Sequence, residues 1–181
     1  MCQLGKLTDK GHRALGRYRE AQEPHELNES IAHFERARDL CPPDHHGHAI
    51  VLFNLATAKL IYCQVNNVSP DFDAPIDLYR ASLSLRPSGH PDYPLTLFNL
   101  GIALVARFQR LHNEVDVAEG KAFLSQVLDV TPADSHVYQG ALLTLSTATI
   151  SESMQVPELP QTAEDDVDVD EEILQMAEFV L

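Results

Sequence analysis

A segment of this chain recurs at a constant spacing of 45 residues. Residues 31–42 align without a gap on 76–87, and the sequence Leu-Phe-Asn-Leu occupies both 52–55 and 97–100. A third, more diverged copy follows, and the first residues of the chain match the end of an earlier copy. Self-similarity at a fixed period of this length is the signature of a repeat architecture, in which each unit is one supersecondary element.

Each copy contains two helical patterns joined by a short polar segment. In the first pattern, Ile31, Phe34 and Ala37 recur at three-residue spacing, as in a helix with one buried stripe. The second pattern, at 50–62 and 95–108, is apolar over most of its circumference, as in a helix packed between neighbours on both sides. We therefore predict helices over 7–21, 25–40, 48–63, 73–86, 92–110, 115–130 and 135–149.

The repeat also predicts how these helices assemble. A single helix pair cannot cover its own apolar faces, whereas stacked pairs share one continuous core. No stretch of residues 1–150 alternates with a period of two for long enough to require a strand. We therefore predict an all-α, right-handed α-solenoid of antiparallel helix pairs, with about three repeats in residues 1–150.

The acidic residues gather near the C-terminus. Residues 151–181 carry ten acidic side chains and no Lys or Arg, which leaves 17 acidic and 13 basic side chains in residues 1–150. We predict an acidic disordered linker over 151–170, because like charge and low apolar content cannot offset the entropy of ordering. Residues 171–181 predict a short amphipathic helix, with one face made of Ile173, Leu174, Ala177, Val180 and Leu181.

A helix as short as 171–181 is marginal in water and needs a surface. The repeat domain offers two surfaces in cis, namely the exposed edge of the last repeat and the concave groove, and an external partner offers a third. We favour an intramolecular contact over an external one.

Charge and termini exclude several functional classes. A formal charge of −14 argues against neutralisation of nucleic-acid phosphates and against an anionic membrane surface. The first residues contain no apolar run of signal-peptide length, and Cys2, Cys41 and Cys63 form no CxxC pair. We expect a soluble cytoplasmic protein with reduced thiols, without nucleic-acid or membrane partners.

Two side-chain clusters raise the question of a metal or catalytic site. Cys41, His45, His46 and His48 are possible transition-metal donors, but the counterpart of His45 one period later is His90, where no cluster exists. Residues 134–136 (Asp-Ser-His) are adjacent, so they cannot converge as a catalytic triad does, and Ser135 is better explained as a helix N-cap. We expect no metal, no cofactor and no enzymatic activity.

The residues of the third copy resemble the tetratricopeptide repeat. The matching positions are Leu100, Gly101, Leu104, Gly120, Leu124, Val127 and Pro132. The resemblance covers residues 8–149, but the period of 45 exceeds the usual value of about 34. The chain is therefore similar to long-period members of that family, such as the repeats of kinesin light chain and of fungal repeat arrays.

This resemblance implies a peptide-binding groove along the inner helices. Asn54 and Asn99 occupy the same inner-helix position, and the resemblance assigns them hydrogen bonds to the backbone of a bound peptide. Alternatively, both amides bond to a neighbouring helix and fix its packing. Thr57, Leu95 and Ile102 are expected to line the same wall, and Lys59 and Arg107 to add selection for acidic ligands.

The function expected on this basis is a non-catalytic module that binds a peptide segment of a partner protein in the concave groove, modulated by its own C-terminal helix. The alternative is a structural role, in which the chain is a fragment of a longer array and self-associates through exposed terminal repeats.

Overall fold

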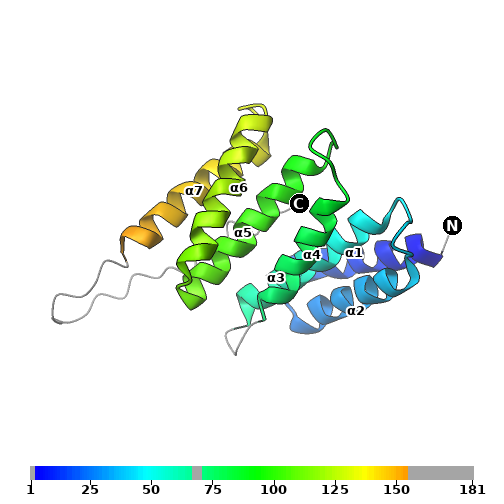
Figure 1. The fold of residues 1–181 in the computed structure, drawn as a ribbon. Helices are drawn as coiled ribbons and strands as arrows, with labels where there is room; N and C mark the ends of the chain where they lie inside the picture. The colour runs from blue at the N-terminus through cyan, green and yellow to red at the C-terminus, as the bar shows by residue number, and fades with distance from the viewer. Residues whose placement is uncertain (1–2, 67–70, 155–181) are drawn as a thin grey trace. The chain divides into compact units, whose positions relative to one another are not determined.

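The computed structural model describes residues 3–66 and 71–154, and this part of the chain contains helices and no strand (Figure 1). The predicted all-α class is therefore confirmed. In chain order the helices are α1 (Gln3–Ala21), α2 (Pro24–Leu40), α3 (His48–Val65), α4 (Asp73–Ser84), α5 (Tyr93–Leu111), α6 (Glu114–Val130) and α7 (His136–Ser153). The predicted C-terminal helix over 171–181, and the predicted linker from residue 155 onward, lie outside the described residues.

The observed helices follow the predicted ones, and the largest differences are at the start of α1, which begins at Gln3 and not at residue 7, and at the C-terminal ends of α4 and α7. Helix α4 stops at Ser84, because the backbone N–H groups of Leu85 and Arg86 bond to the carbonyls of Ser82 and Leu83 in a tightened last turn. Helix α7 continues to Ser153, past the predicted end at residue 149.

The chain divides into two compact units, Met1–Thr96 and Leu97–Leu181, and the division falls within α5. We therefore describe the contacts of each unit separately.

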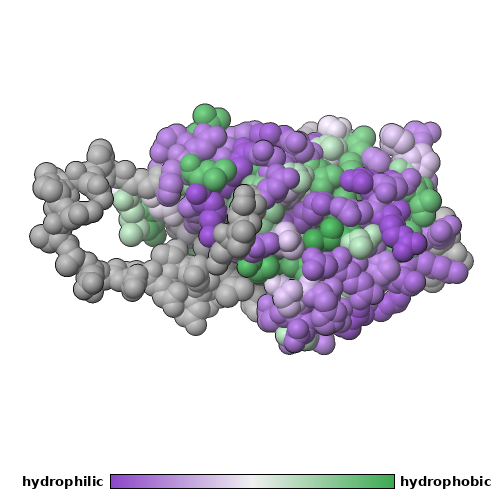
Figure 2. Space-filling model, turned by 90° about the horizontal axis from the view of Figure 1, so that it is seen from below, coloured by the Kyte–Doolittle hydropathy of each residue, from purple (hydrophilic) through white to green (hydrophobic). Residues whose placement is uncertain are grey.

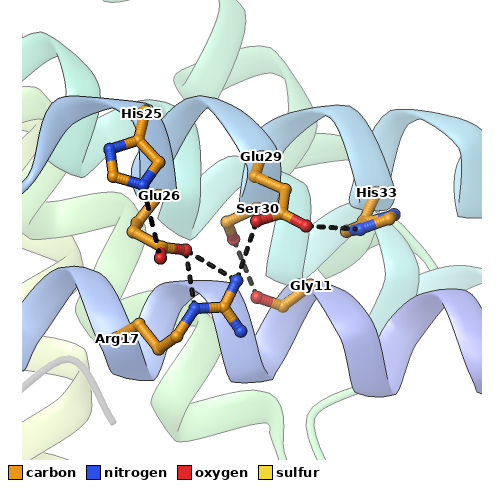
Figure 3. A network of polar contacts seen from close by, with 7 residues as sticks. All are labelled: Gly11, Arg17, His25, Glu26, Glu29, Ser30 and His33. Atoms are coloured by element: carbon orange, nitrogen blue, oxygen red, sulfur yellow. Dashed lines mark hydrogen bonds and ion pairs between the residues drawn. The ribbon is translucent and has the colours of Figure 1, made fainter.

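In the first unit, α1 and α2 form an antiparallel pair with a close contact at Gly11. A Cβ atom on Gly11 would lie 2.5 Å from the ring of Phe34, so the ring packs directly on the α1 backbone. The Ser30 hydroxyl donates to the Gly11 carbonyl at 3.0 Å (Figure 3). Only a residue without a side chain allows two helices to approach this closely.

An exposed ion-pair network joins the other end of the same two helices. The Arg17 guanidinium donates to the carboxylates of Glu26 and Glu29, with Nη2 2.6 and 2.7 Å from the two oxygens (Figure 3). The hydrogen bond from Arg17 lowers the pKa of Glu26. Because residue numbers rise along α1 while those of their α2 partners fall, the contacts at Gly11 and Arg17 establish the antiparallel pairing.

Helices α3 and α4 form the second antiparallel pair of this unit. The Thr57 hydroxyl and the Tyr79 hydroxyl are 2.9 Å apart, and the rings of Phe53 and Tyr79 meet edge to face at 5.6 Å. The Ser82 hydroxyl donates to the carbonyl of Ala49 at 2.8 Å. Tyr79 is fully buried, which makes it the central side chain of this pair.

In the second unit, α5 and α6 repeat the contacts of α1 and α2 at an offset of 90 residues, two periods of the repeat. A Cβ on Gly101 would lie 2.8 Å from the side chain of Leu124, just as Gly11 meets Phe34. Arg107 donates to both carboxylate oxygens of Asp116 at 2.8 and 2.6 Å, at the positions equivalent to Arg17 and Glu26.

The turns that follow α1 and α5 are also equivalent. Gln22 has a φ of 55° and His112, ninety residues later, has a φ of 56°. The Gln22 N–H donates to the backbone carbonyl of Tyr18, and the His112 N–H donates to that of Phe108, each at 2.7 Å. A single left-handed residue therefore ends each of these helices and reverses the chain.

Within each unit, the first helices of successive pairs lie beside one another in parallel. Asn54 Nδ2 of α3 is 3.2 Å from His12 Nε2 of α1. In the second unit, Gly140 of α7 packs on the ring of Phe98 of α5, and Gln109 bonds to Ser151 at 3.4 Å. Each of these contacts joins residues 42 apart in sequence. The same neighbour relation therefore occurs in both units.

A repeated turn leads into α3, α5 and α7. In each turn a backbone N–H donates to the carbonyl oxygen of the proline three residues earlier, at 2.8 to 3.0 Å. The pairs are His45 with Pro42, His90 with Pro87 and Ser135 with Pro132. The side chains at these positions then accept hydrogen bonds from the start of the next helix. His45 and His90 accept through Nδ1 from the N–H two residues on, and Ser135 Oγ accepts from Tyr138 N–H at 3.2 Å. The predicted N-cap at Ser135 is thus confirmed.

Helix α3 is long and apolar enough by length and composition to cross a membrane, but 61% of it is buried inside the protein. Its apolar residues pack against α1, α2 and α4, which is the environment of a core helix. The surface shown in Figure 2 is largely polar, with apolar side chains in separate patches.

The close approach at Gly11 yields a testable prediction. The Gly11→Ala change should lower the free energy of unfolding by about 1–3 kcal/mol, because the new methyl group overpacks against the buried Phe34 ring. The Gly16→Ala change, in the same helix but with nothing within 4 Å of the added Cβ, should raise it by about 0.5–1 kcal/mol. Urea denaturation followed by circular dichroism measures both, and equal stability of the two variants would contradict the close contact.

Candidate functional site

Asn54 of α3 is held by a residue of α1. Its Nδ2 lies 3.2 Å from Nε2 of His12, and the residue is only 7% exposed. For this contact to be a hydrogen bond, the amide donates and the neutral imidazole accepts. The Asn54 side chain therefore takes part in inter-helix packing, as the alternative interpretation of this asparagine expects.

Asn99 of α5 occupies the equivalent position and differs from Asn54. It is fully buried, and neither its Nδ2 nor its Oδ1 has a hydrogen-bond partner within the described residues. Burial of an amide without partners is costly, and such groups are rare in folded proteins. Asn99 is thus the inner-helix residue with unused hydrogen-bonding capacity.

Thr57 and Ile102, one turn after the two asparagines, are both buried. The Thr57 hydroxyl donates to the Phe53 carbonyl at 3.0 Å or bonds to the Tyr79 hydroxyl at 2.9 Å, so its hydrogen bonds are made inside the first unit. Leu95, near the start of α5, is half-buried. Of these three residues predicted to line the groove, Leu95 is the most exposed to solvent.

The two predicted cations are both engaged in ion pairs. Lys59 Nζ lies 2.8 Å from the Glu35 carboxylate of α2, and both side chains are partly exposed. Arg107 forms its two-bond pair with Asp116, which is 2% exposed. A buried carboxylate deprived of this two-bond ion pair is costly, so Arg107 is fixed in place more firmly than Lys59.

Two residues of this region were not singled out by the sequence. His12 has no equivalent histidine in the later copies, so the repeat gave no signal for it. The second residue is Arg86, whose side chain is only 3% exposed. Its guanidinium carbon lies 5.1 Å from the centroid of the Phe53 ring, and its Nη1 donates to the Thr96 hydroxyl at 2.5 Å. Burial lowers the pKa of Arg86, while Asp92 opposes that shift. A Leu-Arg-Pro sequence at a helix end gives no hint of such burial.

Two of the side chains considered as metal donors, those of His45 and His48, bond to the backbone. His45 Nδ1 accepts from the Gly47 N–H at 3.0 Å, and His48 Nδ1 is 3.1 Å from the Cys41 carbonyl oxygen. Burial raises the pKa of the Cys41 thiol. In residues 3–66 and 71–154, no three His, Cys, Asp or Glu side chains gather closely enough to hold a metal ion.

Comparison with known proteins adds no name to these features. No family model, no curated protein and no solved structure matches this chain. The repeat and the contacts described above are therefore the features from which a function can be inferred.

The contrast between the two asparagines predicts different costs of substitution. The Asn99→Leu change should raise the free energy of unfolding by about 1–2 kcal/mol, because it replaces an unpartnered buried amide with an apolar group of similar size. The Asn54→Leu change should leave the free energy of unfolding about 1 kcal/mol lower than the Asn99→Leu change does, because it also removes the bond to His12. Thermal and urea unfolding provide the comparison, and a destabilised Asn99→Leu variant would show that the amide is satisfied.

The His12 contact predicts a pH dependence. Protein atoms around the ring lower the pKa of His12 through desolvation, Arg19 lowers it further, and Asp9 opposes both. The unfolded chain therefore binds a proton more readily than the folded chain, so that stability falls as the pH drops through the ordinary histidine range. The His12→Gln change keeps an acceptor for Asn54 and should reduce this loss, whereas His136→Gln, at an exposed position of α7, should not. Urea midpoints from pH 8 to pH 5 measure the difference.

Proposed function

We propose that this chain is a non-catalytic protein–protein interaction module of the tetratricopeptide-like type, in which stacked helix pairs form a groove for a peptide segment of a partner. The observation that carries this proposal is the repetition of the helix-pair contacts at Gly11 and Gly101, and at Arg17 and Arg107. Stacks of equivalent helix pairs create extended concave surfaces, and such surfaces are used for protein binding.

Asn99 is the strongest candidate for contact with the bound peptide. Its amide has one acceptor and two donors without partners in the described part of the chain, and an extended backbone offers the complementary groups. Because Asn99 is fully buried, a peptide reaches it only when the side chains that cover it move. Asn54 is already bonded to His12, so it joins the contact by exchanging that bond.

Lys59 and Arg107 make a smaller contribution to this proposal. Lys59 is partly exposed and its ion pair with Glu35 is solvated, so an acidic ligand competes for it at little cost. Arg107 is held by buried Asp116 and gives its positive charge to that pair. Selection for acidic peptides would therefore fall mainly to Lys59.

A second candidate function is self-association through an exposed terminal helix. It is favoured by the apolar side chains that α7 presents to solvent, among them Leu143 and Ile150. Light scattering at increasing protein concentration separates the two functions, because a peptide-binding monomer keeps its mass and a self-associating chain does not.

The peptide-binding proposal predicts a dependence on the two asparagines. Linear peptides selected from a phage library on the full chain should bind the Asn54→Ala, Asn99→Ala double variant about tenfold or more weakly, since each amide–backbone contact contributes about 0.5–1.5 kcal/mol. Fluorescence polarisation gives the dissociation constants, and circular dichroism checks that the helical content is retained.

The matched control for this experiment is Asn28→Ala, which removes an exposed asparagine on α2 and should leave the affinity unchanged. The proposal fails if the selected peptides bind the double variant as tightly as the native chain, or if Asn28→Ala weakens binding equally.

A further inference from the structure

Helix α7 exposes apolar side chains along one face. Leu142, Leu143 and Ile150 of α7, together with its C-cap residue Met154, are each between 42% and 73% exposed. At 100° per residue these side chains fall within one third of the helix circumference, and the buried residues of α7 lie on the opposite side. The helix therefore has one covered face and one uncovered apolar face.

The uncovered face of α7 corresponds to a covered face of α5. In α5, Gly101 meets Leu124 of α6, and Val105 packs against α6 as well. The residues of α7 one period later are Ser146 and Ile150, and both are exposed. The positions that receive a following helix in the α5 and α6 pair thus receive none from the described residues in α7.

The first unit supports the same assignment. Phe53 of α3, which is equivalent to Leu143, packs edge to face on Tyr79 of the following helix. Helix α1, by contrast, presents polar residues to solvent, including Lys6, Lys10 and Arg13. The side of α1 that carries these residues is therefore polar, whereas the uncovered side of α7 is apolar.

We infer that residues 171–181 of the same chain cover this face of α7 as the missing second helix of the last pair. The segment carries Ile173, Leu174, Ala177, Val180 and Leu181 at the spacing of one helical face. In helical form it is about 16 Å long, and Leu142 and Met154 are about 18 Å apart along α7. The two apolar faces therefore match in length.

The intervening chain is long enough to make this contact. Residues 155–170 connect Met154 to the segment, and 16 residues reach at most about 53–58 Å when extended. That reach exceeds the length of the α7 face. Tethering at this distance gives a local concentration in the millimolar range, which offsets the marginal stability of a short helix.

A second copy of the chain is the competing occupant. The four exposed side chains of α7 offer on the order of a few hundred Å² of apolar surface. A stable dimer of standard size buries about 800 Å² on each partner. The face is therefore large enough for a tethered helix, whereas a stable dimer would have to bury further surface beyond this face.

A photo-crosslinking experiment tests the inference on the full chain. The photoreactive residue p-benzoylphenylalanine replaces Leu143, and light and heavy isotope forms of the chain are mixed before irradiation. We expect crosslinks from position 143 to peptides containing residues 173–181, within one isotope form and at monomer mass. The same probe at Leu40, an apolar residue of α2 with similar exposure, should give no crosslink to that segment.

The Ile173→Asp, Val180→Asp double variant supplies the second measurement, because these residues lie outside the described helices. It should reduce the crosslink yield from position 143 by about tenfold or more, since two buried aliphatic side chains become carboxylates. The inference is overturned if crosslinks join light to heavy chains, if position 143 gives no crosslink to 173–181, or if the double variant leaves the yield unchanged. None of these outcomes depends on whether a peptide binds near Asn99.

Discussion

The direct contact between a glycine backbone and a bulky side chain of the next helix sets the geometry of the helix pairs. Gly11 receives the ring of Phe34, and Gly101 receives Leu124 ninety residues later. Two helices that touch in this way have their separation fixed by a single contact, since any added side-chain atom would push them apart. The equivalent positions in α3 and α4 hold Ala56 and Tyr79, both fully buried.

Once the separation is fixed, the other contacts follow at equivalent positions, but their solvent exposure differs. Arg17 pairs with two carboxylates at the surface, where such pairs contribute little stability. Arg107 makes the same contact with Asp116 in a buried setting, where the attraction is offset by desolvation. Neither pair is therefore the main source of stability, and their common role is to orient one end of each helix pair.

The fold was more predictable from the sequence than the site. The period of 45 gave the helices because each repeat shows the same apolar spacing and the same proline-containing turn. The site depends on neighbours that the repeat does not specify. Asn54 and Asn99 are equivalent in sequence, yet within the described residues Asn54 bonds to His12 while the Asn99 amide has no partner. His12 itself is not repeated, since the residue one period later is Thr57.

The hydroxyl side chains of α7 make their hydrogen bonds within the helix itself. Ser146, Thr147 and Thr149 bond to carbonyls of the preceding turn of the same helix at 2.9 to 3.0 Å. These hydroxyls need no partner from water or from another helix, so covering the face leaves no polar atom unsatisfied. An apolar surface interrupted by self-satisfied hydroxyls is less aggregation-prone than a continuous one and still favours a helix that lies against it. The local chemistry of α7 is therefore compatible with the contact proposed for residues 171–181.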